Sequence, residues 1–204
     1  MRRLLGSCLL LSVLLGAPPA SAQLSPQFGV ALGVNIATLS APADVGTRQM
    51  ASGGVVVRLG LPGPLSLEPQ LLLSQKGTTV QGGGGSIRYG AGYLNLPLLL
   101  RVDGPSLGAV SPYGMLGGFG GVKLFEQQRA GGDLGFPLNV GASFFRRTDA
   151  GLTAGVGGTI PLAVRYEHGL VDVARSVDEQ PYAQAPFPSS AQTRTWAIML
   201  RLGI

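Results

Sequence analysis

The sequence predicts an all-β protein, an eight-stranded antiparallel up-and-down transmembrane β-barrel preceded by a cleaved signal peptide. Three observations carry this prediction: apolar residues alternate with small or polar ones in many short segments, the connections between segments are alternately long and short, and the composition is unusual. The chain has 204 residues, of which 33 are Gly and 15 Pro, and only 12% are charged. Such a composition disfavours both a helical protein and a charged disordered one.

The first 22 residues predict an export signal. Two arginines precede an apolar run that ends in small residues, the order of a secretory signal peptide. We expect cleavage after Ala22, so that residues 1–22 are the signal peptide and residues 23–204 are the barrel domain. Cleavage there removes Cys8, the only cysteine, and with it any disulfide framework or thiolate metal site.

Membrane entry by helices is excluded by the length of the apolar runs. After the signal peptide none reaches the roughly 18 consecutive apolar residues that a membrane helix needs. A chain without such helices enters lipid as a closed barrel, because every backbone polar group there needs a partner. The basic residues are scattered singly, which argues against a nucleic-acid partner.

The first half of the barrel is predicted from period-two alternation. In the segment YLNLPLLLRV the even positions are all Leu or Val, whereas the odd positions include Asn95 and Arg101. A Leu-Pro-Gly-Pro sequence at 61–64 predicts a tight turn. We expect the first four strands over residues 27–38, 51–61, 65–79 and 93–102.

The second half follows the same plan. We expect a Gly-rich strand over 110–125, whose two faces stay open because glycines fall on both. Loops are expected at 126–147 and 174–192, with the assignment of 136–147 as strand or loop left open. The remaining strands are expected over residues 148–159, 162–173 and 193–204. Short turns at one end and long loops at the other are typical of bacterial outer-membrane barrels.

The direction of the two faces follows from space and solubility. A lumen of eight strands is just wide enough for side chains and cannot hold dozens of large aliphatic ones. A Gly-rich face with few charges would also make a poorly soluble surface. We therefore expect the leucine-rich face to meet lipid and the small and polar face to line the lumen.

The inward charges are predicted to form a polar network. A register that sums to 126 across the 61–64 turn places Arg58 opposite Glu68, and one that sums to 366 across the last hairpin places Arg165 opposite Arg201, with Glu167 diagonal to Arg201. The network either ties and fills the lumen or forms a polar relay or narrow pore. Its expected members are Arg58, Glu68, Gln70, Asn95, Arg101, Arg165, Glu167 and Arg201.

Two further groups of residues were weighed for function. The aromatic side chains either join interfacial girdles or fill space; they are Tyr93, Tyr113, Tyr166 and Trp196. A hydrolase with His168 as base beside Glu167, Asp172 or Ser176 is opposed by strand parity, which points His168 to the outer surface. With one histidine in the chain we expect no catalytic residue, no metal site and no cofactor.

Several segments, taken together and in order, resemble the PorT-like outer-membrane β-barrel domain family of Gram-negative bacteria. They are LEPQLLLSQKG (67–77), YLNLPLLLRV (93–102), SPYGMLGG (111–118), DAGLTAGVGG (149–158), VRYEHGLVDV (164–173) and WAIMLRLGI (196–204). The resemblance implies the barrel fold and an outer-membrane location. The sequence departs from the family at Asn95, where the family usually has an acidic residue, and at Ile204, where barrels often end in an aromatic one.

The expected function is a small integral outer-membrane barrel with a plugged polar lumen and a structural or accessory role in the envelope. Two alternatives remain: an accessory component of a protein secretion system, which the resemblance implies, and a narrow channel or small-ligand carrier. The expected partners are outer-membrane lipid, the barrel-assembly machinery during biogenesis, and secretion or envelope proteins that bind through the loops.

Overall fold

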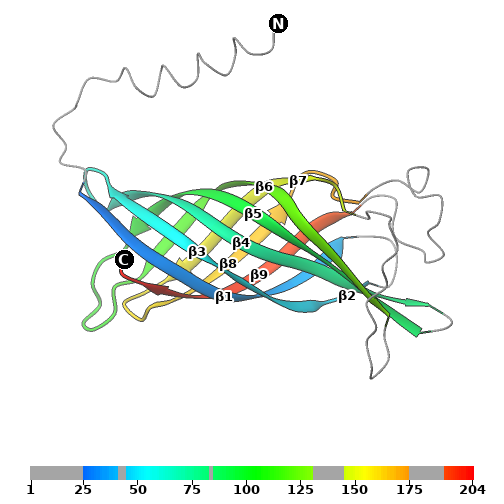
Figure 1. Ribbon diagram of the computed structural model, residues 1–204. Coiled ribbons are helices and arrows are strands. Elements are labelled where there is room, and N and C mark those ends of the chain that lie inside the picture. Colours follow the sequence, from blue (N-terminus) through cyan, green and yellow to red (C-terminus); the bar gives the residue numbers. More distant parts are fainter. Residues whose placement is uncertain (1–24, 41–44, 83–84, 131–144, 175–190) are drawn as a thin grey trace, which may run out of the picture.

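The described part of the chain forms one closed β-barrel. The computed structural model describes residues 25–40, 45–82, 85–130, 145–174 and 191–204. Figure 1 shows these strands crossing a single barrel at a common tilt. The predicted signal peptide lies outside the described residues. Within them, no helix is long and apolar enough to cross a membrane.

Within the described ranges, nine strands fill eight places in the barrel wall. The short strand β2 pairs with β4 beyond the start of β3, so β2 and β3 share one place. The strands are β1 (Pro26–Ser40), β2 (Val45–Gly46), β3 (Arg48–Gly60), β4 (Leu65–Gly82), β5 (Gly85–Asp103), β6 (Tyr113–Ala130), β7 (Thr148–Gly157), β8 (Leu162–Gly169) and β9 (Gln192–Leu202).

Closure comes from antiparallel pairing of neighbours all the way round. β1 pairs with β3 on one side and with β9 on the other, and β4 pairs with β5. The remaining neighbours pair in sequence order up to β9. Closure leaves no free sheet edge, which a strand protein in lipid requires. The predicted eight-stranded antiparallel up-and-down barrel is confirmed.

The two ends of the barrel differ. At the end called here the turn end, short connections over 61–64, 104–112 and 158–161 join β3 to β4, β5 to β6 and β7 to β8. The start of β1 and the C-terminus lie at the same end (Figure 1). The connections into β3, β5, β7 and β9 lie at the opposite end, called the loop end.

The aliphatic face points outward, as predicted. Phe28 is 70% exposed, Leu96 61% and Trp196 54%, whereas their inward neighbours in the strands, such as Asn95 and Ala197, are buried. A solvent-facing surface of this kind would be an extended apolar patch, which monomeric soluble proteins rarely carry. The exposed apolar wall therefore suits a barrel surrounded by hydrocarbon.

β5 starts earlier than predicted. It spans Gly85–Asp103 instead of 93–102, so residues 85–92, predicted to lie in a long connection after β4, are strand paired with β4.

β6 differs from prediction at both ends. Instead of 110–125 it spans Tyr113–Ala130, so residues 126–130, predicted as loop, are strand paired with β5. Its late start follows from Pro112, which has no N–H for the ladder. The faces left open by the sequence are now assigned: Tyr113, Met115 and Phe119 are buried on the inward face.

A β-bulge explains why alternation did not reveal the end of this strand. Gly92 pairs with Phe125 and Tyr93 with Lys123, so Leu124 is an extra residue in β6. An extra residue inverts the inward and outward positions beyond it. Lys123 and Glu126, three residues apart, consequently both face the lumen, and Lys123 Nζ donates to Glu126 Oε2 at 2.6 Å.

The last strands are shorter than predicted. β7 ends at Gly157 rather than 159, and β8 ends at Gly169 rather than 173. After β8 the chain turns across the loop end, where Ala174 bridges to Phe145. Most of the predicted loops, including 136–144 and 175–190, lies outside the described residues.

Candidate functional site: the charged lumen

The first lumen cluster, the turn-end cluster, centres on a single carboxylate. Glu68 of β4 is fully buried. Arg201 of β9 donates to its Oε2 at 2.5 Å, and Arg101 of β5 donates to its Oε1 at 3.4 Å. Arg101 also donates to Asp103 at 2.7 and 2.9 Å, and Arg58 donates to the other oxygen of Asp103. Three guanidinium groups are thus held by two carboxylates.

An aromatic ring completes this cluster. The guanidinium carbon of Arg101 lies 3.5 Å from the ring centroid of Tyr113, and that of Arg201 lies 5.4 Å from it. Arg201 also donates to the Tyr113 hydroxyl at 3.0 Å. Because a guanidinium is attracted to the face of an aromatic ring, Tyr113 holds both arginines where Glu68 can accept from them.

The second cluster, the loop-side cluster, is built on a buried lysine. Lys76 of β4 places Nζ 2.9 Å from Asp149 of β7 and 3.1 Å from Glu167 of β8. Arg165 donates to Glu167 at 2.9 Å and to Gln70 of β4 at 2.9 Å. Two cations therefore face two carboxylates, and the charges balance inside a region that excludes solvent.

These contacts cross the lumen rather than follow the wall. In the circular strand order β8 lies four places from β4, so the bond from Arg165 to Gln70 joins opposite walls. The pair of Lys76 with Asp149 and the pair of Glu68 with Arg201 each join strands three places apart. Both the turn-end cluster and the loop-side cluster therefore connect strands that are not neighbours in the barrel wall.

The loop end is closed by a third group of residues, the plug. Its apolar side chains pack with Tyr89 and Tyr93 of the wall; they are Phe145, Val173, Ala174 and Ala191. Lys123 donates to the Phe145 carbonyl at 2.5 Å and Arg146 Nε to the Ala174 carbonyl at 3.0 Å.

A carboxylate joins the two sides of the plug. Asp172 accepts from the backbone N–H groups of Ala174, at 3.1 Å, and Ala191, at 2.8 Å. The chain leaving β8 is thereby held against the chain entering β9. Residues at the bases of two loops are fixed over the loop end of the lumen.

The eight network residues named from the sequence all lie on the inward face. All but Arg58 are buried, and Arg58 is partly exposed at the turn end. Asn95 is fully buried, but among the described residues neither its Oδ1 nor its Nδ2 has a hydrogen-bond partner. Asn95 is therefore separate from the two ionic clusters.

One predicted register is confirmed and the other is wrong. Val56 pairs with Gln70 and Leu59 with Leu67, the register that sums to 126. Arg58 nevertheless pairs with Asp103, while Glu68, opposite it in this register, accepts from Arg101 and Arg201.

Across the last hairpin Arg165 lies opposite Ala197, not Arg201, and Glu167 lies opposite Thr195. The predicted pairing of Arg165 with Arg201, with Glu167 diagonal to Arg201, is therefore wrong. A long loop such as 174–192 leaves the register free, whereas a tight turn sets it.

Sequence reasoning missed several members of the network. Lys76 is not among the network residues named from the sequence, and Asp103 and Asp149 stand next to predicted turns or loops. Lys123 and Glu126 were hidden by the bulge. Strand parity could have identified Lys76, because its even position in β4 puts it on the same face as Glu68 and Gln70.

The aromatic residues divide between the two roles left open. Tyr93 and Tyr113 are buried inside the lumen and fill space. Tyr166 and Trp196 pair across β8 and β9 on the outer face, with ring centroids 4.8 Å apart. This outer pair has the placement of an interfacial girdle.

The hydrolase site considered around His168 is not assembled in the described residues. His168 lies on the outer face while Glu167 points inward, and Asp172 is bonded to the plug. Ser176 lies outside the described residues. Within the part of the chain that the structure describes, no three metal-ligating side chains come together.

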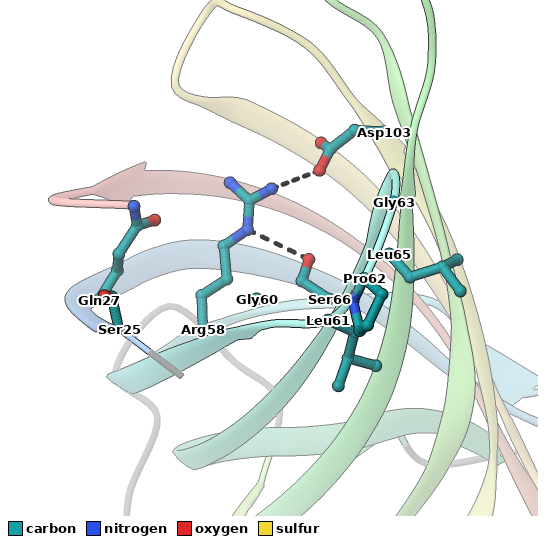
Figure 2. Close-up of a pocket in the computed structure, with 10 residues that line it drawn as sticks. All are labelled: Ser25, Gln27, Arg58, Gly60, Leu61, Pro62, Gly63, Leu65, Ser66 and Asp103. Atoms are coloured by element: carbon teal, nitrogen blue, oxygen red, sulfur yellow. Dashed lines mark hydrogen bonds and ion pairs between the residues drawn. The ribbon is translucent and has the colours of Figure 1, made fainter. Parts of the chain in front are cut away.

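An open pocket of about 490 Å³ lies at the turn end (Figure 2). Arg58 and Asp103 meet over it, and Arg58 also donates to Ser66 at 3.1 Å. Its walls come from the start of β1 and the turn at 61–64. Because its charged groups already pair with each other, the pocket is the outer mouth of the turn-end cluster rather than a separate site.

The family model for the outer membrane protein beta-barrel domain matches residues 21–175, more than half of the chain. The chain belongs to this family. A member of the outer membrane protein beta-barrel domain family is located in the bacterial outer membrane, where short turns face the periplasm and longer loops face outward. The turn end of this barrel is therefore periplasmic and the loop end is at the cell surface.

One solved structure with a TM-score above 0.5 agrees with this family on the fold. The outer membrane protein OprG from Pseudomonas aeruginosa is similar over 88% of this chain and 95% of its own, with 12% identity and a TM-score of 0.51. Neisserial surface protein A (NspA) matches over 87% of this chain and 97% of its own, with 12% identity and a TM-score of 0.46. No curated protein sequence matches the chain.

Proposed function

We propose that this outer-membrane barrel is a structural or accessory envelope protein whose lumen is plugged and does not conduct ions. The observation that carries the proposal is the set of ion pairs that cross the lumen, from Glu68 to Arg201 and from Lys76 to Asp149 and Glu167. An ion moving along the axis would have to replace these pairs one after another.

The energetics favour a closed lumen. Removing one partner of a buried ion pair costs about 3–5 kcal/mol, because the other charge is left uncompensated. A permeating ion meets two such clusters and the apolar plug around Phe145 in series. The proposed role therefore rests on a rigid wall that presents the loops at the cell surface, where contacts with partners concentrate.

Planar-bilayer recordings test the closed lumen directly. The refolded wild-type protein is expected to give no stable conductance. Glu68→Ala leaves Arg201 without its anion and Arg101 with Asp103 alone, and it is expected to give brief openings when it is combined with Lys76→Met and Phe145→Ala, which disrupt the loop-side cluster and the plug. Asp103→Asn is the matched control, since it removes a carboxylate that is one-third exposed at the rim. Steady wild-type conductance that changes with Arg101→Ala or Arg165→Ala would favour the channel or small-ligand carrier instead.

An accessory role in protein secretion is the second candidate. Its support is the ordered set of segments, from LEPQLLLSQKG to WAIMLRLGI, that resembles the PorT-like family. Gentle detergent extraction from native outer membranes, followed by the mass and composition of the particle that carries this chain, tests it. Secretion proteins in fixed ratio support the role, and a lone barrel contradicts it.

A further inference from the structure

The outer face of β8 and β9 changes character step by step towards the loop end. Cross-strand pairs on this face are Val164 with Ile198, then Tyr166 with Trp196, then His168 with Arg194. The order is aliphatic, aromatic and basic. Successive pairs are two residues apart, or about 6–7 Å along the strand.

This order matches the layers of a lipid leaflet. Aliphatic side chains face acyl chains, and Trp and Tyr gather where the acyl chains meet the headgroups. A pair one step beyond the aromatic level lies at the depth of the headgroups. In this barrel the pair at that depth, on the side of the loop end, is His168 with Arg194.

His168 and Arg194 are together called here the basic patch, and the aromatic pair Tyr166 and Trp196 lies next to it on the side of the turn end. The Tyr166 ring lies 4.8 Å from the Trp196 ring and 6.3 Å from the His168 ring, to which it is inclined by only 27°. The Tyr166 ring thus lies between those of Trp196 and His168, and Arg194 is the register partner of His168. On the far side of Arg194, Thr38 of β1 pairs with it in register and points to the same face.

The guanidinium of Arg194 has no protein anion as partner in the described ranges. It is exposed, and no ion pair or hydrogen bond of its side chain occurs among the described residues. Glu167 of the neighbouring strand β8 and Asp149 of the next strand, β7, point inward and are bonded to Lys76. The patch therefore presents positive charge and N–H donors to the lipid side.

We propose that His168 and Arg194 bind the phosphate group of a lipid headgroup in the outer leaflet. A guanidinium matches phosphate oxygens with two parallel N–H donors, and the imidazole supplies another N–H. The occupant is a lipid because the patch continues without a break from the apolar wall. Its acyl chains lie along Val164 and Ile198, which are 42% and 50% exposed.

Native mass spectrometry of the purified full chain, exchanged into mixed micelles, tests this site. The probes are phosphatidylglycerol and phosphatidylcholine with the same acyl chains. Wild type is expected to retain more phosphatidylglycerol, and Arg194→Gln is expected to lower that retention about fivefold, the factor for about 1 kcal/mol per basic residue at a membrane surface. Arg194→Lys is expected to keep part of the preference.

Arg147→Gln is the charge-matched control. Arg147 is exposed at the same end, but its backbone bonds to Lys123 of β6, away from β9. Equal loss in both variants, or no wild-type preference for phosphatidylglycerol, overturns the proposal. Heat-modifiable migration on gels shows that each variant is folded, and His168→Gln, expected to lower retention about twofold, replaces Arg194→Gln if that variant does not fold.

Discussion

Arg201 Nη2 lies 2.5 Å from Glu68 Oε2, so that the last strand of the barrel is bonded through the lumen to β4. Glu68 is also the acceptor for Arg101. One carboxylate thus accepts from two buried guanidinium groups. Substitutions that remove the charge at position 68 are therefore expected to destabilise the barrel.

Glu68→Gln is expected to lower the free energy of unfolding by about 3–5 kcal/mol, because the buried Arg201 loses its anion and Arg101 keeps only Asp103. Urea unfolding from lipid vesicles, followed by the shift between folded and unfolded bands on gels, measures it. Asp103→Asn, at a partly exposed position, is expected to cost no more than about 1 kcal/mol. Equal losses in the two variants would contradict a central role for Glu68.

Lys76 and Asp149 are expected to be strongly coupled. Lys76→Met leaves Asp149 without a cation and Glu167 with Arg165 alone, and Asp149→Asn removes the unpaired charge. The double variant is therefore expected to be more stable than the sum of the single losses predicts. A double-mutant cycle in the same unfolding assay is expected to give a coupling of about 1–3 kcal/mol. Additive losses would show that the 2.9 Å contact contributes little.

The lumen is expected to be closed to water-soluble reagents. The barrel domain has no cysteine, and Thr153 is 2% exposed on the inward face. Thr153→Cys is therefore expected to react with a charged methanethiosulfonate about tenfold or more slowly than Ala109→Cys in an exposed turn. Adding Phe145→Ala is expected to speed the reaction of Thr153→Cys. Equal rates at positions 153 and 109 would contradict a closed lumen.

Two glycines of β6 are expected to respond differently to the same change. A Cβ on Gly117 would lie 2.0 Å from the Leu98 carbonyl oxygen, whereas a Cβ on Gly120 meets nothing within 4 Å. Gly117→Ala is expected to lower the free energy of unfolding by about 1–3 kcal/mol, because the backbone must move apart. Gly120→Ala is expected to leave it nearly unchanged, and a similar loss in both would contradict this contact.

Much of the fold was predictable because a strand with one face in lipid has a strict period of two. Phe28, Leu96 and Trp196 could be assigned to the outer face from alternation alone. The tight turn at 61–64 also set the β3–β4 register correctly. Where one extra residue enters at Leu124, alternation inverts and both the end of β6 and the inward position of Glu126 were missed.

The network was only partly predictable for a different reason. Cross-strand parity identifies which side chains face inward, but it pairs only neighbouring strands. Glu68 meets Arg201, and Gln70 meets Arg165, across the lumen. Such contacts depend on barrel diameter and on the register of the last hairpin, which its long loop leaves undetermined.

The ion pairs and hydrogen bonds that β4 makes across the lumen bear on how the chain assembles. Lys76, Gln70 and Glu68 stand in the first half of the chain, while Asp149, Arg165, Glu167 and Arg201 are synthesised later. A half-inserted sheet would carry uncompensated charges into hydrocarbon, where they are costly. We therefore expect charge neutralisation to couple insertion to the arrival of the final hairpin, so that the strands of this barrel enter the membrane together.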